Sequence, residues 1–171
     1  MRFCNDPGYE LAKTIMKDYD AIISSPIGYI GIRATGDRIH AVDLRVQASR
    51  ERLPRDGAAA NAARAIKAYF ASGHWPEGIA LQEQGTPFQK RVWRLLRSIR
   101  PGSALTYGEV ARRLDSGPRA VGQACRANPC PILTPCHRVV SASGAGGFSG
   151  RSSGDWPRMK AWLLRHEGYL R

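Results

Sequence analysis

Helix-start signals in the second half of the chain constrain its fold more than any other feature. Thr86 stands three residues before Gln89, and Thr106 stands three residues before Glu109. In such a capping box, the threonine hydroxyl accepts from the later backbone N–H, and the later side chain accepts from the threonine N–H. We therefore predict that a helix begins at each threonine.

The first of these helices is predicted to be amphipathic and to end at Pro101-Gly102. Pro87 suits its first position, because a proline has no N–H to donate there. Apolar residues recur at helical spacing along it and should pack inward. They are Phe88, Val92, Leu95, Leu96 and Ile99.

The second helix is short and is followed by a third across a three-residue turn. The second helix should end at Leu114, Asp115-Ser116-Gly117 forms the turn, and Pro118 starts a helix that Asn128-Pro129 stops. Two short helices around such a turn are typical of a helix-turn-helix. An ordinary helical hairpin with solvated arginines is the alternative.

The third helix has two unlike faces. Its apolar and small residues are expected to face inward: Ala120, Val121, Ala124 and Cys125. The opposite face is basic, small and polar, with Arg119, Gly122, Gln123 and Arg126. Small residues permit close approach to a DNA groove, and arginine can contact phosphates or base edges.

The net charge is +12, and nearly all of it belongs to the second half. Residues 1–85 hold eleven Lys/Arg against ten Asp/Glu, a net +1, whereas residues 86–171 hold fifteen against four, a net +11. Such asymmetry is typical of a surface that binds a polyanion. Nucleic acid is the first candidate and acidic lipid the second, while a basic surface kept for solubility would not explain the neutral half.

The segment Pro135-Cys136-His137-Arg138-Val139-Val140 is the candidate reactive site. A thiol becomes nucleophilic when it ionises, which a nearby cation or imidazolium favours. Adjacent side chains of an extended strand point to opposite faces, so Cys136 and His137 can interact only across a kinked backbone or a bridging water. Nearby prolines favour the kink. A buried, inert cysteine beside a surface histidine is the alternative.

The remaining cysteines and the apolar pattern exclude several classes of protein. Cys4, Cys125 and Cys130 form no C-x-x-C pair with each other or with Cys136, and no histidine has zinc-finger spacing, so we expect no metal site. The sequence has no run of about 18 apolar residues and no signal-peptide layout. We expect an intracellular protein that spans no membrane.

The first half is predicted to hold strands and one helix. Apolar, β-branched runs separated by turn residues indicate strands at 21–23, 29–32 and 39–44. An alanine-rich helix is predicted over 58–70. We expect three parts: an N-terminal α/β domain (1–72), a linker (73–85) and a mostly helical domain (86–171).

The chain ends in a loop rich in serine and glycine (141–154) and a last helix that starts at Asp155 or Trp156 and is followed by Glu167. The helix carries core-like residues at helical spacing, which are Met159, Trp162, Leu163 and His166.

In this order, the motifs resemble those of the O6-alkylguanine-DNA alkyltransferases. The resemblance covers the whole C-terminal half, and the weaker Ser25-Pro26-Ile27-Gly28 fits that family's N-terminal domain. The motifs are Thr86-Pro87-Phe88-Gln89 with Val92-Trp93, Thr106-Tyr107-Gly108-Glu109-Val110-Ala111, Arg119-Ala120-Val121-Gly122, Asn128-Pro129, Pro135-Cys136-His137-Arg138-Val139-Val140 and Trp162-Leu163-Leu164 with Glu167. The resemblance implies an α+β fold, with a small RNase H-like domain followed by a helical domain that contains the helix-turn-helix.

The resemblance also implies direct-reversal DNA repair without a cofactor. A methyl or small alkyl group would move from O6 of a flipped-out guanine in double-stranded DNA to Cys136, and O4 of thymine is left open as a second substrate position. The thioether product is inert, so each molecule would act once. The protein would be a monomer, located at the nucleoid in the cytoplasm of a bacterium or archaeon, or in the nucleus of a eukaryote.

Individual roles follow from the same resemblance. His137 would deprotonate Cys136 through a water, Glu167 would orient His137, and Asn128 would organise the turn behind the cysteine. Tyr107 would contact the base and help to protonate the departing guanine.

Two further groups of residues complete the implied site. Arg119 would fill the gap left by the flipped base, and the other candidate DNA contacts are Thr106, Ala120, Gly122, Gln123 and Arg126. Besides Tyr107, the base pocket would contain Val139, Gly147, Phe148 and Ser149. Phe148 stands where the family often has tyrosine, and the segment 151–157 looks longer than the family's usual link.

Three other functions are compatible with parts of the pattern: a lesion-binding relative without activity, a redox-sensing helix-turn-helix regulator and a cysteine hydrolase. The combination of Cys136, His137 and Glu167 argues against the first. The chain shows no dimerisation segment for the second, and no oxyanion-hole signature for the third.

Overall fold

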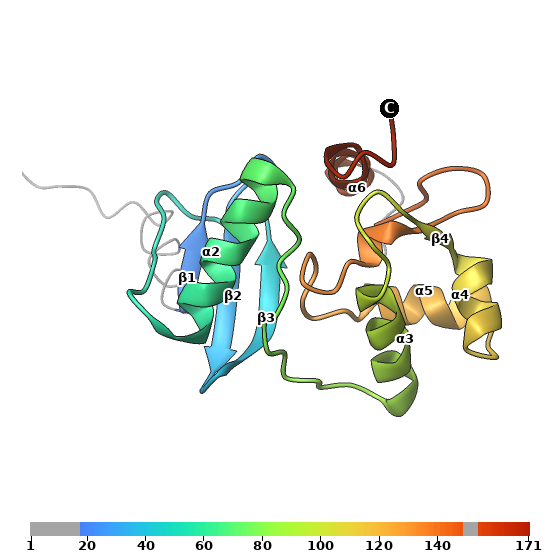
Figure 1. The fold of residues 1–171 in the computed structure, drawn as a ribbon, viewed down its shortest axis with the longest axis horizontal. Helices are drawn as coiled ribbons and strands as arrows, with labels where there is room; N and C mark the ends of the chain where they lie inside the picture. The colour runs from blue at the N-terminus through green and yellow to red at the C-terminus, as the bar shows by residue number, and fades with distance from the viewer. Residues whose placement is uncertain (1–17, 149–153) are drawn as a thin grey trace, which may run out of the picture. The chain divides into compact units, whose positions relative to one another are not determined.

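The structure is a computed structural model that describes residues 18–148 and 154–171. The chain divides into two compact units, residues 1–82 and residues 83–171, and each is described by itself (Figure 1). Both contain helices and strands, which confirms the predicted mixed α/β class. No helix in the described ranges has the length and apolar character needed to cross a bilayer.

Unit 1 contains an antiparallel sheet of three strands. They are β1 (Ala21–Ile23), β2 (Ile30–Thr35) and β3 (Arg38–Leu44), paired in the order β1-β2-β3. Ile22 lies opposite Gly31, and Ile32 lies opposite Val42. Gly31 is required by packing, because a Cβ there would lie 2.4 Å from the ring of Tyr19.

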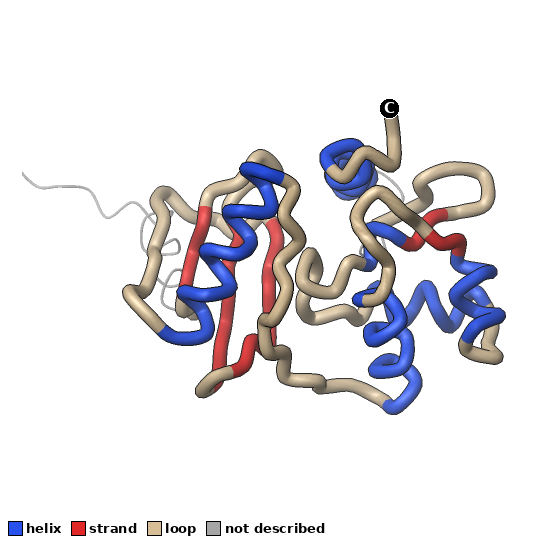
Figure 2. Tube along the Cα trace, in the orientation of Figure 1, coloured by secondary structure: helices blue, strands red, loops and turns tan. Residues whose placement is uncertain are grey.

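One helix, α2 (Gly57–Ser72), packs against all three strands (Figure 2). Its buried face is built mainly of alanines, which let a helix approach a sheet closely: Ala59, Ala60, Ala62, Ala63, Ile66 and Tyr69. Gly73 ends the helix in the left-handed conformation with φ 75°. Farther along the segment expected to be a linker, Leu81 forms an isolated parallel bridge with Ile39 of β3.

In unit 2, both capping boxes form as predicted. At the start of α3 (Pro87–Arg97), Gln89 N donates to Thr86 Oγ1 at 3.2 Å, and Thr86 N donates to Gln89 Oε1 at 2.9 Å. At the start of α4 (Tyr107–Arg113), Glu109 N donates to Thr106 Oγ1 at 3.1 Å, and Thr106 N donates to Glu109 Oε2 at 2.6 Å.

The buried face of α3 is rotated relative to the prediction. Val92 and Leu96 are buried as expected, and so is Ile99 just beyond the helix, but Phe88 and Leu95 are only half-buried. Trp93 is buried in their place, and its Nε1 donates to the backbone oxygen of Ala124 at 2.8 Å. This hydrogen bond ties α3 to the next helix but one.

The predicted helix-turn-helix is present as α4 and α5 (Pro118–Arg126), which pack on each other, while α3 packs on α5. Asp115 adopts φ 50° in the connecting turn. Val121, Ala124 and Cys125 face inward as predicted, but Ala120 is exposed. Its inward assignment was wrong because the buried stripe of this short helix is narrower than the apolar pattern.

Two very short strands and a last helix complete unit 2. The strands β4 (Leu105–Thr106) and β5 (Val139–Val140) pair in parallel, and a single 3₁₀ turn, η1 (Cys136–Arg138), precedes β5. The last helix, α6 (Asp155–His166), buries Met159, Lys160, Leu163 and Leu164. Trp162 and His166, predicted to be core residues, are instead half-buried and stack with ring centroids 5.0 Å apart.

Candidate active site

Cys136 begins the 3₁₀ turn η1, directly after Pro135. Its backbone N–H donates to the oxygen of Thr134 at 2.8 Å. A 3₁₀ helix rotates successive side chains by about 120° rather than the half-turn of a strand. The kinked backbone that the Cys-His pair requires is therefore present. The cysteine is 5% exposed, and Cys125 and Cys130 are also buried and reduced.

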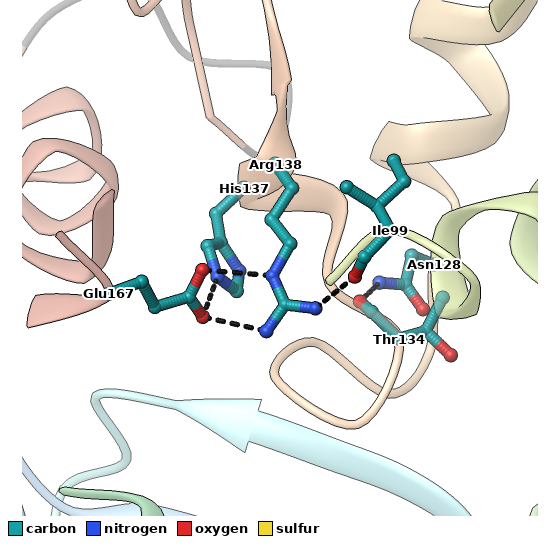
Figure 3. Close-up of polar contacts among 6 residues, drawn as sticks. All are labelled: Ile99, Asn128, Thr134, His137, Arg138 and Glu167. Carbon is teal, nitrogen blue, oxygen red and sulfur yellow. Dashed lines mark hydrogen bonds and ion pairs between the residues drawn. The ribbon is translucent and has the colours of Figure 1, made fainter. Parts of the chain in front are cut away.

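Asn128, which lies just beyond α5, supports the cysteine turn. Its Nδ2 donates to the oxygen of Thr134 at 2.8 Å (Figure 3) and to Sγ of Cys136 at 3.2 Å. Its Oδ1 accepts from the N–H of Cys130 at 3.1 Å. One side chain thus braces the loop on both sides of Pro135 and directs an N–H dipole at the sulfur, where it stabilises a thiolate.

His137 is fully buried and is held from one side. Its Nε2 lies 2.9 Å from Oε1 of Glu167, the residue that caps the end of α6 (Figure 3). A carboxylate oxygen can only accept, so the Nε2 atom carries the proton. The other ring nitrogen, Nδ1, is buried and has no hydrogen-bond partner in the described part of the chain. Nδ1 can therefore accept a proton.

Arg138 is also fully buried, and it contacts the same carboxylate (Figure 3). Its Nε donates to Oε2 of Glu167 at 2.8 Å, and its Nη2 donates to Oε1 at 2.8 Å. Its Nη1 donates to the backbone oxygen of Ile99. Sequence reasoning treated this arginine only as a neighbour of Cys136, because nothing local indicates that its partner lies 29 residues away.

Lys160 is a second buried cation that sequence reasoning missed. Its Nζ donates to the backbone oxygens of Val139 at 2.6 Å and Gly147 at 3.0 Å. The same Nζ lies 5.7 Å from the centroid of the Tyr107 ring. The helical spacing could have indicated its burial, because Lys160 lies beside Met159 and one turn before Leu164, on the apolar face of α6.

Tyr107 begins α4, and its ring lies between two glycines. A Cβ on Gly122 of α5 would be 4.0 Å from its Cε1, and a Cβ on Gly146 would be 3.7 Å from its Cε2. Burial raises the pKa of Tyr107 to about 12. The phenol is therefore protonated at neutral pH and can donate a hydrogen bond.

Burial shapes the other titratable groups as well. It raises the pKa of Cys136, against which the Asn128 hydrogen bond and the charge of Lys160 act. It lowers the pKa of His137, and the charges of Arg138 and Lys160 act in the same direction while Glu167 opposes them. Burial lowers the pKa of Lys160 to about 8.

Glu167 is ionised in spite of its burial. Burial works to raise its pKa, but hydrogen bonds from His137 and Arg138 outweigh that effect and lower the pKa to about 2. The site therefore combines a carboxylate, a neutral histidine with an available Nδ1 and a thiol whose negative form has two stabilising neighbours. This arrangement can deprotonate Cys136 and support a nucleophilic sulfur.

The candidate DNA contacts gather on and near α5. Arg119, Ala120, Gln123 and Arg126 are exposed, and Gly122 is half-buried. No described carboxylate forms an ion pair with Arg119 or Arg126. Thr106 differs from the others, because its hydroxyl is engaged with Glu109 in the capping box.

The structure describes all of the candidate base-pocket residues except Ser149. Val139 and Phe148 are buried, and the ring centroid of Phe148 lies 6.1 Å from that of Trp156. Lys160 joins Val139 to Gly147 through their carbonyl oxygens. Ser149 lies outside the described residues.

Sequence comparisons relate the chain to known proteins. A family model described as 6-O-methylguanine DNA methyltransferase, DNA binding domain, matches residues 87–169. The methylated-DNA–protein-cysteine methyltransferase of Methanosarcina acetivorans is 36% identical over 158 residues, which covers 88% of this chain and 98% of that protein. The Salmonella typhimurium protein of the same name is 48% identical over 88 residues, and this match spans only about half of each chain, 50% and 49%.

Solved structures agree over most of the chain. The Mycobacterium tuberculosis O6-methylguanine methyltransferase is 32% identical, with a TM-score of 0.72 over 88% of this chain and 92% of that one. Another neighbour is the Mycobacterium tuberculosis OGT in complex with DNA, at 34% identity and a TM-score of 0.70, covering 87% of this chain and 92% of that one. The fold and the buried Cys–His–Glu arrangement define a class of proteins that join a helix-turn-helix to a buried cysteine. The chain belongs to the methylated-DNA–protein-cysteine methyltransferase family.

Proposed function

We propose that this protein repairs DNA by direct reversal, moving a methyl or small alkyl group from O6 of guanine in double-stranded DNA to its own Cys136. One observation carries the proposal: the buried Cys136 thiol accepts a hydrogen bond from Asn128 at 3.2 Å, next to a histidine whose buried Nδ1 has no hydrogen-bond partner among residues 18–148 and 154–171. Family membership supports this reaction. The DNA complex of the similar Mycobacterium tuberculosis OGT supports DNA as the partner.

The reaction begins with the loss of the thiol proton. Nδ1 of His137 accepts it through a bridging water, while Nε2 stays bonded to Glu167. The resulting thiolate is stabilised by the N–H of Asn128 and by the positive charge of Lys160. These groups offset the cost of forming a negative charge in a buried position.

The thiolate then displaces guanine from the alkyl group. A bond forms between Sγ and the alkyl carbon, the bond from that carbon to O6 breaks, and its electron pair remains on the guanine. The phenol of Tyr107 transfers its proton to the guanine as this charge develops. The proton held by His137 then restores the phenol of Tyr107. In the net balance Cys136 loses one proton and guanine gains one, while Tyr107 and His137 return to their starting forms. Cys136 ends as a thioether that water does not cleave.

The exposed face of α5 is the proposed DNA contact. Arg119 and Arg126 are exposed there without carboxylate partners among the described residues, and the small side chains of Ala120 and Gly122 let the helix approach a groove. The target base must leave the stack before a sulfur nucleophile can reach its substituent. Arg119 would occupy the gap, and Val139, Gly147, Phe148 and Ser149 would surround the flipped base together with Tyr107.

The direct test is to incubate the protein with a duplex that contains one O6-methylguanine. We expect intact-protein mass spectrometry to show one added methyl group, and peptide mapping to place it on Cys136. Cys125→Ser is a matched control that should react like the wild type, and Cys136→Ser should not react. The protein should sediment as a monomer before and after the reaction.

Other outcomes would assign other functions. A lesion that is bound but remains intact beside an unmodified Cys136 would indicate a non-catalytic damage-binding protein. Tight binding to one undamaged sequence would indicate a regulator. Under the proposed function, the protein acts wherever the genome lies, which in a bacterium or archaeon is the nucleoid.

A further inference from the structure

The buried guanidinium of Arg138 has no part in the reaction described so far. It is completely shielded from solvent, and its fork engages both carboxylate oxygens of Glu167 (Figure 3). A third bond, to the backbone oxygen of Ile99, fixes the guanidinium in place. Two parallel hydrogen bonds between an arginine and a carboxylate hold the two planar groups against rotation, whereas a carboxylate held by one hydrogen bond can rotate.

The carboxylate is shared between two donors. Oε1 of Glu167 accepts from Nη2 of Arg138 at 2.8 Å and lies 2.9 Å from Nε2 of His137. If Arg138 were absent, more of the negative charge of Glu167 would act on the imidazole, in a site without solvent screening. A second proton on the ring would then be favoured.

A second proton would stop the reaction, because it would occupy Nδ1. That nitrogen is buried and unpartnered among the described residues, and a histidinium has no lone pair with which to accept the proton of Cys136. The charged groups that act on the imidazole are Arg138 on its own 3₁₀ turn, Lys160 on α6 and Glu167 at the end of α6. Of these, Arg138 is the cation bonded to the carboxylate itself.

We propose that Arg138 is a positioning residue that keeps His137 a neutral base. By binding both oxygens of Glu167, it balances the carboxylate charge and fixes the Nε2 hydrogen bond, so Nδ1 keeps its lone pair. The direction of the His137 pKa agrees, since burial and the charge of Arg138 both lower it. This role rests on the proposed function, in which His137 accepts the thiol proton.

Nitrogen NMR tests the protonation state without any alkyl transfer. Protein labelled with ¹⁵N-histidine is compared as wild type, Arg138→Met and Arg138→Lys, and His137→Gln identifies the signal. We expect the neutral Nε2–H tautomer at neutral pH in the wild type and in Arg138→Lys, but the doubly protonated ring in Arg138→Met. A doubly protonated His137 in the wild type, or one state shared by all three proteins, would overturn the proposal.

The pH profile of the single-turnover rate separates this role from a purely structural one. For Arg138→Met, the rate should fall by about tenfold for each pH unit below the new titration point of His137 and recover at higher pH. Arg138→Lys keeps the charge but loses the fork, so it should be slower by one constant factor at every pH. An Arg138→Met loss that does not vary with pH would refute the charge-balancing role.

Two controls make the outcomes separable. Arg165→Met removes an exposed arginine from α6 and should leave both the rate and the NMR signal unchanged. Circular dichroism shows whether each variant folds. If Arg138→Met does not fold, the wild-type tautomer and the rate ratio of Arg138→Lys to wild type, expected to be the same at every pH, still decide the question. A wild type that never alkylates Cys136 would refute the proposed function, whereas the NMR result would still report on Arg138.

Discussion

Nδ2 of Asn128 donates to Sγ of Cys136 at 3.2 Å while it also donates to the backbone oxygen of Thr134 at 2.8 Å. The residue that follows the second helix of the helix-turn-helix is therefore bonded directly to the proposed nucleophile. The same side chain accepts from the N–H of Cys130. One amide therefore contacts both the sulfur and the backbone of the loop that carries it.

Replacing Asn128 with alanine should slow alkyl transfer by about tenfold or more, because a hydrogen bond to a charged group contributes about 1.5–3 kcal/mol. The free energy of unfolding should fall by about 2 kcal/mol, because the N–H of Cys130 and the oxygen of Thr134 lose a partner. Single-turnover kinetics and denaturant titration measure the two effects. Asn61→Ala, on an exposed position of unit 1, is the matched control. An unchanged rate in Asn128→Ala would contradict the role of the amide at the sulfur.

Lys160→Met should reveal the cost of a buried ammonium group. The pKa of Lys160 is lowered from 10.5 to about 8, so between these values the unfolded chain binds the proton that the folded chain has lost. The stability of the wild type relative to Lys160→Met should therefore rise from pH 8 to pH 10.5, by at most about 3 kcal/mol. Denaturant titrations in a Cys136→Ser background, which removes the titration of that thiol, measure it. A difference that is constant over this pH range would show that the ammonium is not destabilised by burial.

Glu167→Gln should remove the contribution of the ionised carboxylate to the free energy of unfolding, which protonation at acidic pH also removes. The pKa of Glu167 is lowered from 4.5 to about 2, so its stabilising charge is fully present above 4.5 and is lost as the pH falls through 2. Between pH 4.5 and pH 2, the free energy of unfolding should fall by up to about 3 kcal/mol more in the wild type than in Glu167→Gln. Thermal melts at a series of acidic pH values give the difference. Parallel acid curves for the two proteins would refute the assigned charge.

Arg119→Ala should slow the repair of duplex DNA more than the reaction with a free O6-alkylguanine base. The reason is that only duplex DNA leaves a gap in its stack when a base is flipped. The ratio of the two rates is the measurement. Arg50→Ala removes the same charge from an exposed position in unit 1 and should leave that ratio unchanged. Equal slowing of both reactions by Arg119→Ala would exclude a role in base flipping.

DNA affinity should fall steeply with salt. Residues 86–171 carry a net charge of +11, and each phosphate contact made by a lysine or arginine releases condensed counterions. The logarithm of the binding constant, measured by fluorescence anisotropy, should decrease linearly with the logarithm of the salt concentration. Arg126→Ala should reduce the slope by about 1. A response that is flat in salt would mean that the basic half does not contact the backbone.

Local signals in the sequence predicted the elements that local chemistry determines. The capping boxes at Thr86 and Thr106 formed because each is complete within four residues. The hairpin between β2 and β3 and the turn before Pro118 follow from glycine and aspartate positions in the same way. The proximity of His137 and Glu167 came instead from the order of motifs, since 30 residues separate them.

Burial of charge could not be predicted from periodicity. Arg138 and Lys160 are fully buried, although their residue types usually lie at the surface. Their burial depends on a distant carboxylate and on two backbone oxygens that no pattern reveals. The pairing of β4 with β5 was also missed, because two residues are too few to show alternation.

Under the proposed function, that small parallel pair bears on how far a damaged nucleotide has to move. Leu105 pairs with Val139 and Thr106 with Val140, so the backbone that begins α4 is joined to the backbone just after Cys136. Peptide hydrogen bonds of this pair, together with the Asn128 side chain, thus help to set the offset between the proposed DNA-contacting helices and the sulfur. Under the same proposal, substitutions on the exposed face of α5 would change DNA affinity, whereas the distance that the base must travel would depend on this backbone pairing.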